Sequence, residues 1–574
     1  MKHDLDTMRH SAAHLLAAAV KNLYPKTALG IGPVIEDGFY YDFDSPHNFS
    51  TDDFQKMERE VTRLKKQNIR FERSDRPINE AVILTKKFHE PYKVELIKDL
   101  AKTGVPTVSF YKTGGFIDLC SGPHVEHSGQ VGEVKLLTVA GAYWKGSEQN
   151  KMLQRVYGTA WYSKKELQEY MNRREEIKKR DHKALGTRLE LFFFHETAPG
   201  MPYWLPNGAK IYKALIDFSD RLHKEAGYEE IISPILNKRE LYVTSGHWKY
   251  YLENMFVAKT ADKETYGVKA MNCPNAMLIF SSKTRSYRDL PLRLYDTDPL
   301  HRNERSGTLT GLFRVRQFRQ DDAHIFTRQE DLQRELAELL KLIEKFYSTF
   351  RLEYSFRLGT KPAKSMGSTQ LWKKAEGELK KALDASGARY SILEGDGAFY
   401  GPKADLLIKD SLGRQWQMGT IQIDFQTPRN FKLKFTSQDG KDTPPVVIHR
   451  AIYGSFERFI GILIEHFGGN FPLWLAPIQV TIVPIADRHS NYAKKVVESL
   501  VAENIRSGLD DRSVTMQSKI RDAEMKKVPY VLIIGDKETV RKKVTVRSKG
   551  IKNEGAVDLD NFTRKIKQEI EERR

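Results

Sequence analysis

The chain has 574 residues, 40% hydrophobic and 29% charged, which is typical of a globular protein with room for three or four domains. It has no run of about 18 apolar residues and no apolar signal region at the N-terminus, so membrane-spanning and secreted proteins are excluded. The net charge of +18 is compatible with a nucleic-acid partner without demanding one, and Cys120 and Cys273 are expected to be reduced in a cytoplasmic protein.

The first part of the chain is expected to form one mixed domain, residues 1–162. Apolar residues at helical spacing predict a helix over 1–24, and alternation broken by glycines predicts strands and a turn over 29–43. Residues 52–66 have an acidic start and a basic end, which is typical of a surface helix because each charge complements the helix dipole. Residues 163–186 are charged on most faces and predict a solvated linking helix.

Residues 187–475 combine short β-type runs with helices and with loops rich in Gly and Pro. Residues 330–350 place leucines on one face, which predicts an amphipathic helix against a core. The β-rich runs at 415–425 and 445–449 are separated by hairpin-like breaks, which favours an antiparallel sheet over a doubly wound one. Over 476–574, β and α patterns alternate and 21 Lys/Arg stand against 15 Asp/Glu, so we expect a small, basic α/β domain.

Several separated motifs occur in an order that is informative as a set. They are RHSAAHLL (9–16), DLCSGPHV (118–125), GAYWKG (141–146), MNCP (271–274), LPLRLYDTDPLHRNE (290–304), QDDAHIF (320–326), GAFYGPK (397–403), WQMGTIQIDF (416–425) and HRAIYGSFERFIGIL (449–463). On these motifs the chain resembles the threonyl-tRNA synthetases, a family of class II aminoacyl-tRNA synthetases, over nearly its whole length.

The resemblance implies an α+β multidomain protein. Its parts would be an N-terminal α+β editing domain (1–162), the linking helix (163–186), a class II catalytic core on an antiparallel sheet (187–475) and a C-terminal α/β anticodon-binding domain (476–574). The implied activity is the ATP-dependent ligation of L-threonine to tRNA(Thr) through a threonyl-adenylate. Many relatives carry a small ubiquitin-like domain first. RHSAAH begins here at Arg9, so we expect that domain to be lacking, in a chain that is naturally short or trimmed.

The resemblance assigns phosphate-binding roles to several basic residues. Attack on the α-phosphate builds negative charge on phosphate oxygens, which preorganised cations must meet. Arg302 is implied at the α-phosphate and the substrate carboxylate, Arg314 at the outer phosphates and Arg458 at the far end of ATP. Mg²⁺ is expected to bridge the phosphates. Two further catalytic residues are implied, Lys403 near the reacting oxygens and His247 near the terminal ribose of the tRNA.

A zinc ion, one per subunit, would explain the choice of substrate. Cys273, His324 and His449 offer three ligands and leave a fourth position open, as in catalytic zinc sites. An apolar pocket rejects an isostere poorly, whereas zinc can take the amino group and the hydroxyl of threonine, and valine has no hydroxyl. The resemblance adds substrate-pocket positions at Gln320, Asp322, Tyr400, Gln417 and Gln422.

The motif around Cys273 departs from the common family pattern. Many members read MNCPGH, whereas Asn275 and Ala276 stand here in place of Gly and His. The usual role of that histidine is therefore not carried over.

Serine has the same amino group and hydroxyl as threonine, so a second site that hydrolyses mischarged seryl-tRNA(Thr) is expected. A missing methyl group discriminates by only about 1–3 kcal/mol. The resemblance implies that this editing site contains His10, His14, Lys93, Asp118, Cys120 and His124. Such a set could also hold zinc; we favour the metal-free interpretation, in which the side chains position water.

Two further expectations concern partners. The segment 227–236 resembles class II motif 1, which implies a homodimer. Glu538 and Arg547 are implied to face anticodon bases. The alternatives are a free-standing deacylase of mischarged tRNA, which would leave Arg302, Arg458 and the zinc trio unused, and a non-catalytic RNA-binding paralogue, which would need none of these residues.

Overall fold

The computed structural model describes residues 4–548 and 551–573, in two compact units, Met1–Glu175 and Glu176–Arg574. None of the helices in these described residues combines the length and the apolar character that crossing a membrane requires.

The N-terminal unit is built on one buried helix. Helix α1 (Leu5–Leu23) begins at Asp4, whose side chain accepts from the N–H groups of Asp6 and Thr7. It packs on a sheet in which β1, β3, β8 and β7 follow in that order and β2 pairs with β3. The strands of this sheet are β1 (Ala28–Leu29), β2 (Val34–Ile35), β3 (Gly38–Asp44), β7 (Glu133–Tyr143) and β8 (Met152–Trp161).

A second layer of the same unit is a three-stranded antiparallel sheet in the order β4-β5-β6. The apolar side chains of Ala81, Ile97, Val108 and Phe110 form a small core between it and two helices. The elements of this layer are β4 (Phe71–Pro77), α3 (Ile78–Lys87), α4 (Pro91–Lys102), β5 (Thr107–Thr113) and β6 (Phe116–Leu119). Helix α2 (Thr51–Lys66) belongs to the core formed by α1 and the first sheet.

The segment predicted as one linking helix over 163–186 forms two helices. They are α5 (Lys164–Lys179) and α6 (His182–Arg188). Asp181 ends the continuity because its side chain caps α6, accepting from the N–H groups of Lys183 and Ala184. α5 is solvated as predicted, but His182 at the start of α6 is buried.

The second unit contains the predicted mostly antiparallel sheet, with eight strands in the order β11-β15-β18-β25-β22-β21-β19-β20. Only the edge pairs β11·β15 and β19·β20 are parallel. The strands are β11 (Glu229–Glu230), β15 (Leu292–Asp296), β18 (Asp322–Thr327), β25 (Val446–Ala451), β22 (Gln415–Asp424), β21 (Lys403–Lys409), β19 (Glu353–Gly359) and β20 (Tyr390–Leu393).

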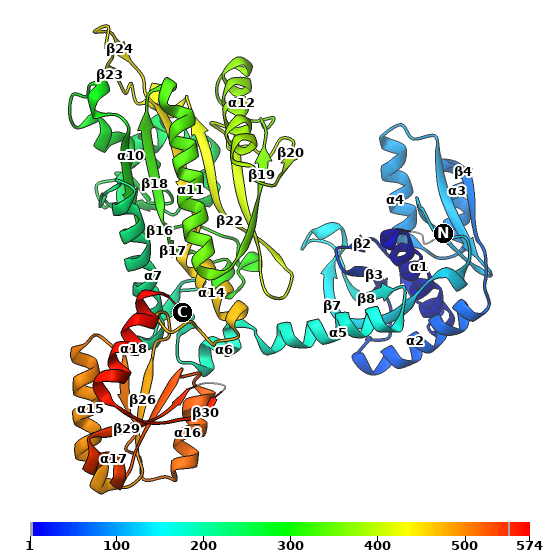
Figure 1. The fold of residues 1–574 in the computed structure, drawn as a ribbon. Helices are drawn as coiled ribbons and strands as arrows, with labels where there is room; N and C mark the ends of the chain where they lie inside the picture. The colour runs from blue at the N-terminus through cyan, green and yellow to red at the C-terminus, as the bar shows by residue number, and fades with distance from the viewer. Residues whose placement is uncertain (1–3, 549–550, 574) are drawn as a thin grey trace. The chain divides into compact units, whose positions relative to one another are not determined.

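The two faces of this sheet differ because side chains alternate along each strand. Ile325, Ile448 and Ile421 belong to the main apolar core, whereas their neighbours His324, His449 and Gln422 point to the other face. Helix α11 runs along the sheet (Figure 1), and its leucines contribute to the same core. The helices of this layer are α7 (Pro206–Glu225), α11 (Leu332–Phe350), α12 (Thr369–Ser386) and α14 (Phe456–Phe467).

The C-terminal region forms the predicted small α/β fold, a sheet in the order β27-β26-β28-β29-β30. β26 pairs in parallel with β27 and β28, and the other pairs are antiparallel. Its elements are β26 (Val480–Pro484), α15 (Ser490–Ala502), β27 (Ser507–Leu509), α16 (Met516–Met525), β28 (Tyr530–Ile534), α17 (Asp536–Arg541), β29 (Lys543–Ser548), β30 (Ile551–Asp558) and α18 (Leu559–Glu571).

Candidate active site and candidate editing site

The polar face of the large sheet aligns four predicted site residues in one row. His324 on β18 lies opposite His449 on β25, His449 lies opposite Gln422 on β22, and Gln422 lies opposite Lys403 on β21. Directly opposed residues of antiparallel strands point to the same face, so the four side chains share one surface. Strand register thus brings together residues up to 125 positions apart in the sequence (324 to 449).

Cys273, His324 and His449 form a buried group whose possible ligand atoms all lie within 4.8 Å of one another. Cys273 is the first residue of helix α10 (Cys273–Ser281). Both ring nitrogens of His324 and the Nδ1 of His449 are buried without a hydrogen-bond partner. Since buried polar atoms are nearly always paired, three orphaned imidazole nitrogens beside a thiol fit a zinc ion.

The chemistry around this group is suited to a metal. The Asp424 carboxylate accepts from His449 Nε2 at 3.0 Å, which leaves Nδ1 for the metal and orients the ring. Burial, followed by the nearby His449, holds the pKa of His324 well below its usual value. The ring centroids of the two histidines are 4.9 Å apart.

Two predicted substrate-pocket residues border the group of Cys273, His324 and His449. The Tyr400 hydroxyl donates to the side-chain oxygen of Gln422, and its ring centroid lies 5.0 Å from that of His449. Asp322 is buried and accepts from the side-chain amide of Asn272 at 3.1 Å. Burial raises the pKa of Asp322 above its usual value, and the nearby His449 only partly offsets this rise.

His247 lies close to the same pocket. It is buried at the start of helix α9 (His247–Tyr250), and its Nδ1 is 2.8 Å from the hydroxyl of Ser245. Burial lowers the pKa of His247 to about 3, so the ring is neutral. It meets Phe399 edge to face at 5.2 Å.

The three predicted phosphate-binding arginines gather beside the sheet. Arg458, in the first turn of α14, donates to the backbone oxygens of Phe313 at 2.8 Å and Gln417 at 3.0 Å. Its pKa is lowered by burial and then by Arg314 and Arg302, so the three positive charges are near one another. Such crowding of cations fits an anionic ligand.

The other two arginines are held differently. The guanidinium of Arg314 contacts the Glu304 carboxylate at 2.9 Å. Arg302 donates to the backbone oxygen of Ala270 at 3.3 Å and lies over the ring of Phe318.

Lys403 belongs to a charged cluster at the end of the histidine row. Its Nζ lies 2.9 Å from an oxygen of Asp405 and 3.0 Å from Asp396. Arg357 reaches the same Asp405 oxygen at 3.1 Å and donates to the side-chain oxygen of Gln417 at 3.0 Å. Gln417 thus belongs to the charged cluster, whereas Gln422 lies beside His449.

The remaining predicted positions of this unit, Gln320, Asn275 and Ala276, contact backbone or apolar side chains. Gln320 precedes β18 and pairs with Ser455, three residues before Arg458. Asn275 donates to the backbone oxygen of Pro234 at 3.4 Å. Ala276, which replaces the usual histidine, is fully buried in an apolar cluster with Met277.

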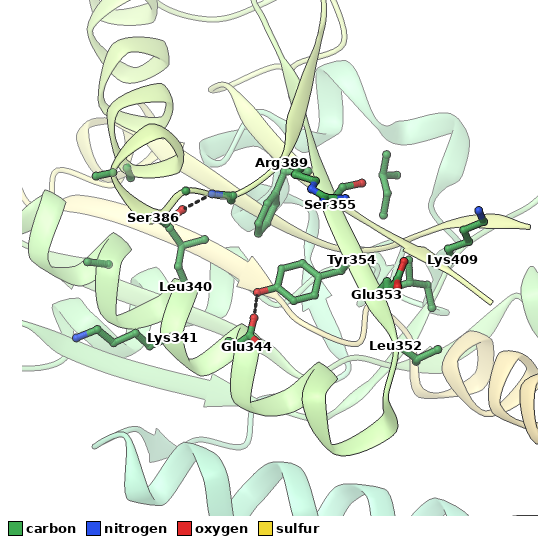
Figure 2. A pocket seen from close by; sticks show the side chains of 18 of the residues that line it. Leu340, Lys341, Glu344, Leu352, Glu353, Tyr354, Ser355, Ser386, Arg389 and Lys409 are labelled. Atoms are coloured by element: carbon green, nitrogen blue, oxygen red, sulfur yellow. Dashed lines mark hydrogen bonds between the residues drawn. The ribbon is translucent and has the colours of Figure 1, made fainter. Parts of the chain in front are cut away.

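A cavity of 1310 Å³ lies elsewhere, between α11, β19 and the end of α12 (Figure 2). Its lining includes the hydrogen-bonded pair of Tyr354 and Glu344 together with apolar side chains such as Leu340. None of the predicted site residues lines it.

The N-terminal unit assembles its own site between α1 and the loop after β6. Cys120 Sγ lies 3.3 Å from His10 Nε2 and 3.2 Å from His124 Nε2, so the three atoms converge. Ser11 contacts His124 Nδ1 at 3.1 Å. Gly122 shapes the loop, because its φ is +71° and a Cβ there would lie 2.3 Å from the Tyr111 hydroxyl.

His14 lies one turn beyond His10, packed edge-on against the His124 ring at 4.9 Å. Its Nε2 is buried without a partner. Burial lowers the pKa of His14 to about 3 and that of His124 to about 2, and it raises the pKa of Cys120 to about 11. The site therefore presents neutral imidazoles and a thiol, which can hold water by hydrogen bonds but are weak bases.

Lys93 and Asp118 form a buried ion pair at 2.8 Å. The Tyr41 hydroxyl, 3.1 Å from Lys93 Nζ, donates to the same carboxylate. Burial, reinforced by Asp118, raises the pKa of Tyr41 well above its usual value, so the phenol stays protonated. Asp118 stands on β6, two residues before Cys120, whereas Lys93 comes from α4 and Tyr41 from β3.

The two predicted anticodon contacts are engaged within the C-terminal domain. Glu538 accepts from the N–H of Gly535 at 3.0 Å and from the Thr545 hydroxyl at 2.8 Å. Arg547 pairs with Glu524 at 2.9 Å.

Several residues that complete these sites were not predicted from the sequence. Asp424 stands two residues after Gln422 on β22, so strand alternation could have placed it on the same face. Asp405 likewise stands two residues after Lys403 on β21. Tyr41, Asn272 and Arg357 gave no such signal, because their partners come from distant segments.

Known proteins resemble this chain over all of these regions. Residues 254–467 match the tRNA synthetase class II core domain (G, H, P, S and T), and residues 479–569 match the anticodon binding domain. Residues 108–157 match the threonyl and alanyl tRNA synthetase second additional domain.

Relatives that match nearly the whole chain include two bacterial ligases. Threonine--tRNA ligase from Clostridium tetani is 49% identical over 567 residues, 99% of this chain and 88% of the relative. The same ligase from Clostridioides difficile is 49% identical over 572 residues, 100% of this chain and 89% of the relative. A crystal structure of the RNA binding domain of threonyl-tRNA synthetase from Cryptosporidium parvum superimposes with a TM-score of 0.66 at 41% identity, covering 68% of this chain and 98% of that one.

Proposed function

The chain belongs to the threonyl-tRNA synthetase family, and we propose that it selects threonine with a bound zinc ion and clears serine errors at a separate site. The family joins threonine to tRNA(Thr) using ATP and Mg²⁺, and the domain that this family associates with editing is present. The proposed division of labour is editing in 1–162, linkage in 163–186, synthesis in 187–475 and anticodon binding in 476–574.

The row from His324 to Lys403 is the observation that carries the proposal. One end of the row, with Cys273, would hold zinc, which supplies a Lewis acid for the amino group and hydroxyl of threonine. Tyr400, Asp322 and Gln422 border that position and orient the amino acid. Lys403 and Gln417 stand at the other end, with Gln320 nearby, where the carboxylate meets ATP.

The arginines act on charge that develops at phosphate. Arg302 holds the α-phosphate and the carboxylate, Arg314 the outer phosphates and Arg458 the far end of ATP. This is supported by the clustering of the three cations. His247, neutral and buried beside the pocket, approaches the terminal ribose of the tRNA.

At the editing site, His10, His14, Cys120 and His124 position water against the ester carbonyl. Lys93 and Asp118 form a buried ion pair that fixes strand β6 next to Cys120. The depressed pKa values of His14 and His124 support water positioning over strong base catalysis.

We further propose a cytoplasmic homodimer whose interface includes the segment 227–236. Ile232 is 82% exposed and Leu236 is 55% exposed, an apolar surface that a second copy would cover. In the C-terminal domain, Glu538 and Arg547 are the proposed anticodon contacts, which requires Arg547 to leave Glu524 when RNA binds.

Threonine-dependent exchange of pyrophosphate with ATP tests the whole proposal. A synthetase catalyses the exchange with threonine and not with valine. A free-standing deacylase would show no exchange but would hydrolyse seryl-tRNA, and an RNA-binding paralogue would do neither. Either of those outcomes refutes the proposal.

A further inference from the structure

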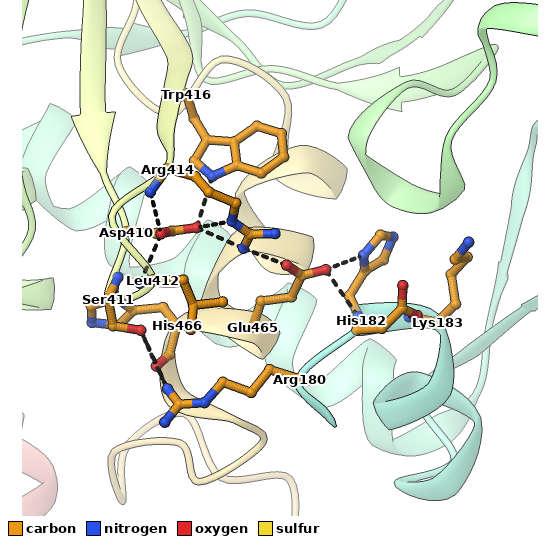
Figure 3. A network of polar contacts seen from close by, with 11 residues as sticks. Arg180, His182, Lys183, Asp410, Ser411, Leu412, Arg414, Trp416, Glu465 and His466 are labelled. Carbon is orange, nitrogen blue, oxygen red and sulfur yellow. Dashed lines mark hydrogen bonds and ion pairs between the residues drawn. The ribbon is translucent and has the colours of Figure 1, made fainter. Parts of the chain in front are cut away.

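A network of buried and half-buried polar side chains joins helix α6, helix α14 and the hairpin between β21 and β22 (Figure 3). At its centre, His182 Nδ1 is 2.7 Å from an oxygen of Glu465, and its Nε2 accepts from the backbone N–H of Leu312 at 3.0 Å. His182 is 1% exposed. Since a carboxylate accepts and an amide donates, the imidazole must be the neutral form protonated on Nδ1.

The network closes through Arg414 and Trp416. Arg414 binds both Glu465 and Asp410, and Trp416 Nε1 donates to Asp410 at 2.9 Å. The ring of Phe313, the residue after Leu312, lies between His182 at 4.1 Å and Trp416 at 4.4 Å.

Both backbone oxygens that hold Arg458 adjoin this network. Phe313 follows Leu312, whose N–H is bound by His182, and Gln417 follows Trp416, whose indole is bound by Asp410. Arg458 and Glu465 also stand on the same helix, about two turns apart. A shift of the turn Gly311–Phe313 would therefore move the acceptor that aims Arg458.

The turn is built to approach the imidazole. Gly311 has a φ of +49°, and a Cβ there would lie 2.2 Å from His182 Nε2. Asp181, His182 and Glu465 could in principle hold a metal, but both nitrogens of His182 and both oxygens of Glu465 already have protein partners. The group is thus satisfied by the chain itself.

We propose that His182, oriented by Glu465, is a positioning residue that fixes the turn Gly311–Phe313 and thereby aims Arg458 and Arg314 at ATP. The inference rests on the proposed ATP-binding roles of these two arginines. His182 touches no reacting atom. Its effect is on the binding and activation of ATP and leaves the threonine pocket unchanged.

Two substitutions of His182 separate its two hydrogen bonds. In His182→Asn the amide can still donate to Glu465, but nothing accepts from Leu312. In His182→Gln the longer side chain can place its oxygen near the former Nε2 and accept from Leu312. Ser411→Ala is the matched control. The Ser411 hydroxyl contacts Arg180 and His466 at the edge of the network rather than His182, Glu465 or Arg414.

Pyrophosphate exchange of the full chain is measured with ATP and threonine varied in turn. We expect His182→Asn to raise the KM for ATP or lower kcat by about 10-fold or more, since a buried amide loses its acceptor. The KM for threonine and the zinc content should not change. His182→Gln should stay within about threefold of the parent, and Ser411→Ala should match it.

The inference is overturned if His182→Asn leaves the ATP dependence unchanged, or if Asn and Gln lose activity equally together with thermal stability. Should His182→Asn fail to fold, Gly311→Ala forces the same turn and the His182 ring apart while both His182 and Glu465 are retained, and must raise the KM for ATP. Arg458→Ala distinguishes a failure of the proposed function from a failure of this inference. If it retains activity, the proposed function fails; if it loses activity while the His182 and Gly311 variants do not, only this inference fails.

Discussion

Replacing Asp424 by alanine should weaken zinc binding without touching a ligand. Its Oδ2 accepts from His449 Nε2 at 3.0 Å, while its Oδ1 accepts from the N–H groups of Gln426 at 2.7 Å and Thr427 at 2.9 Å. The substitution therefore frees the His449 ring and also uncaps a turn. Loss of such an orienting carboxylate costs about 10–100-fold in metal affinity, which is about 1.4–2.7 kcal/mol.

Asp410→Ala separates the two effects. Asp410 caps a comparable turn, accepting from the N–H groups of Leu412 at 2.9 Å and Arg414 at 3.0 Å, but does not contact a proposed zinc ligand. Zinc affinity is measured by competition with a chelator of known affinity, after confirming about one zinc per parent chain. Asp424→Ala should bind zinc about 10–100-fold more weakly, and Asp410→Ala should match the parent. Equal affinity in all three proteins would refute the role of Asp424, and a zinc-free active parent would refute the site.

Further predictions follow from the other sites. Arg302→Ala should lower threonine-dependent pyrophosphate exchange by about 100-fold or more, because a preorganised cation is lost; near-normal exchange would show that it does not meet phosphate charge. His10→Ala should accumulate seryl-tRNA in a charging assay with serine while threonyl-adenylate formation stays intact, and clearance at the parent rate would contradict the editing assignment. Ile232→Asp should shift the protein to monomers in sedimentation, since it charges the exposed apolar surface; an unchanged dimer would exclude this residue from the interface. Burial lowers the pKa of His14 from 6.5 to about 3, so the unfolded chain binds more protons and stability falls as pH drops from about 6.5 toward 3, by up to about 1.4 kcal/mol per unit. Amide exchange of α1 in the full chain should accelerate accordingly, and less so in His14→Leu; equal pH dependence in both would contradict this.

Local patterns in the sequence predicted much of the architecture. The leucine spacing over 330–350 predicted α11, and the β-rich run over 415–425 predicted a strand of an antiparallel sheet. These predictions succeed because helical and strand periodicities are short-range properties of the chain. The separated motifs likewise indicated the family and nominated Cys273, His324 and His449.

Strand order and register were decided only by the tertiary structure. His324, His449 and Gln422 come from three strands, and nothing local indicates that they stand directly opposite one another. The same holds for Lys403: it stands opposite Gln422 on β22, and its ion-pair partner Asp405 stands opposite Arg357 on β19.

His182 shows why the remaining features were inaccessible to sequence reasoning. Its charged surroundings predicted a solvated linker, yet its ring is buried against Glu465, 283 residues later. The free energy that buries a polar side chain comes from partners brought near by the whole fold, and residue spacing along the chain does not carry that information. The sequence by itself determined the elements and the chemistry available; the packing of distant segments decided which of those groups meet.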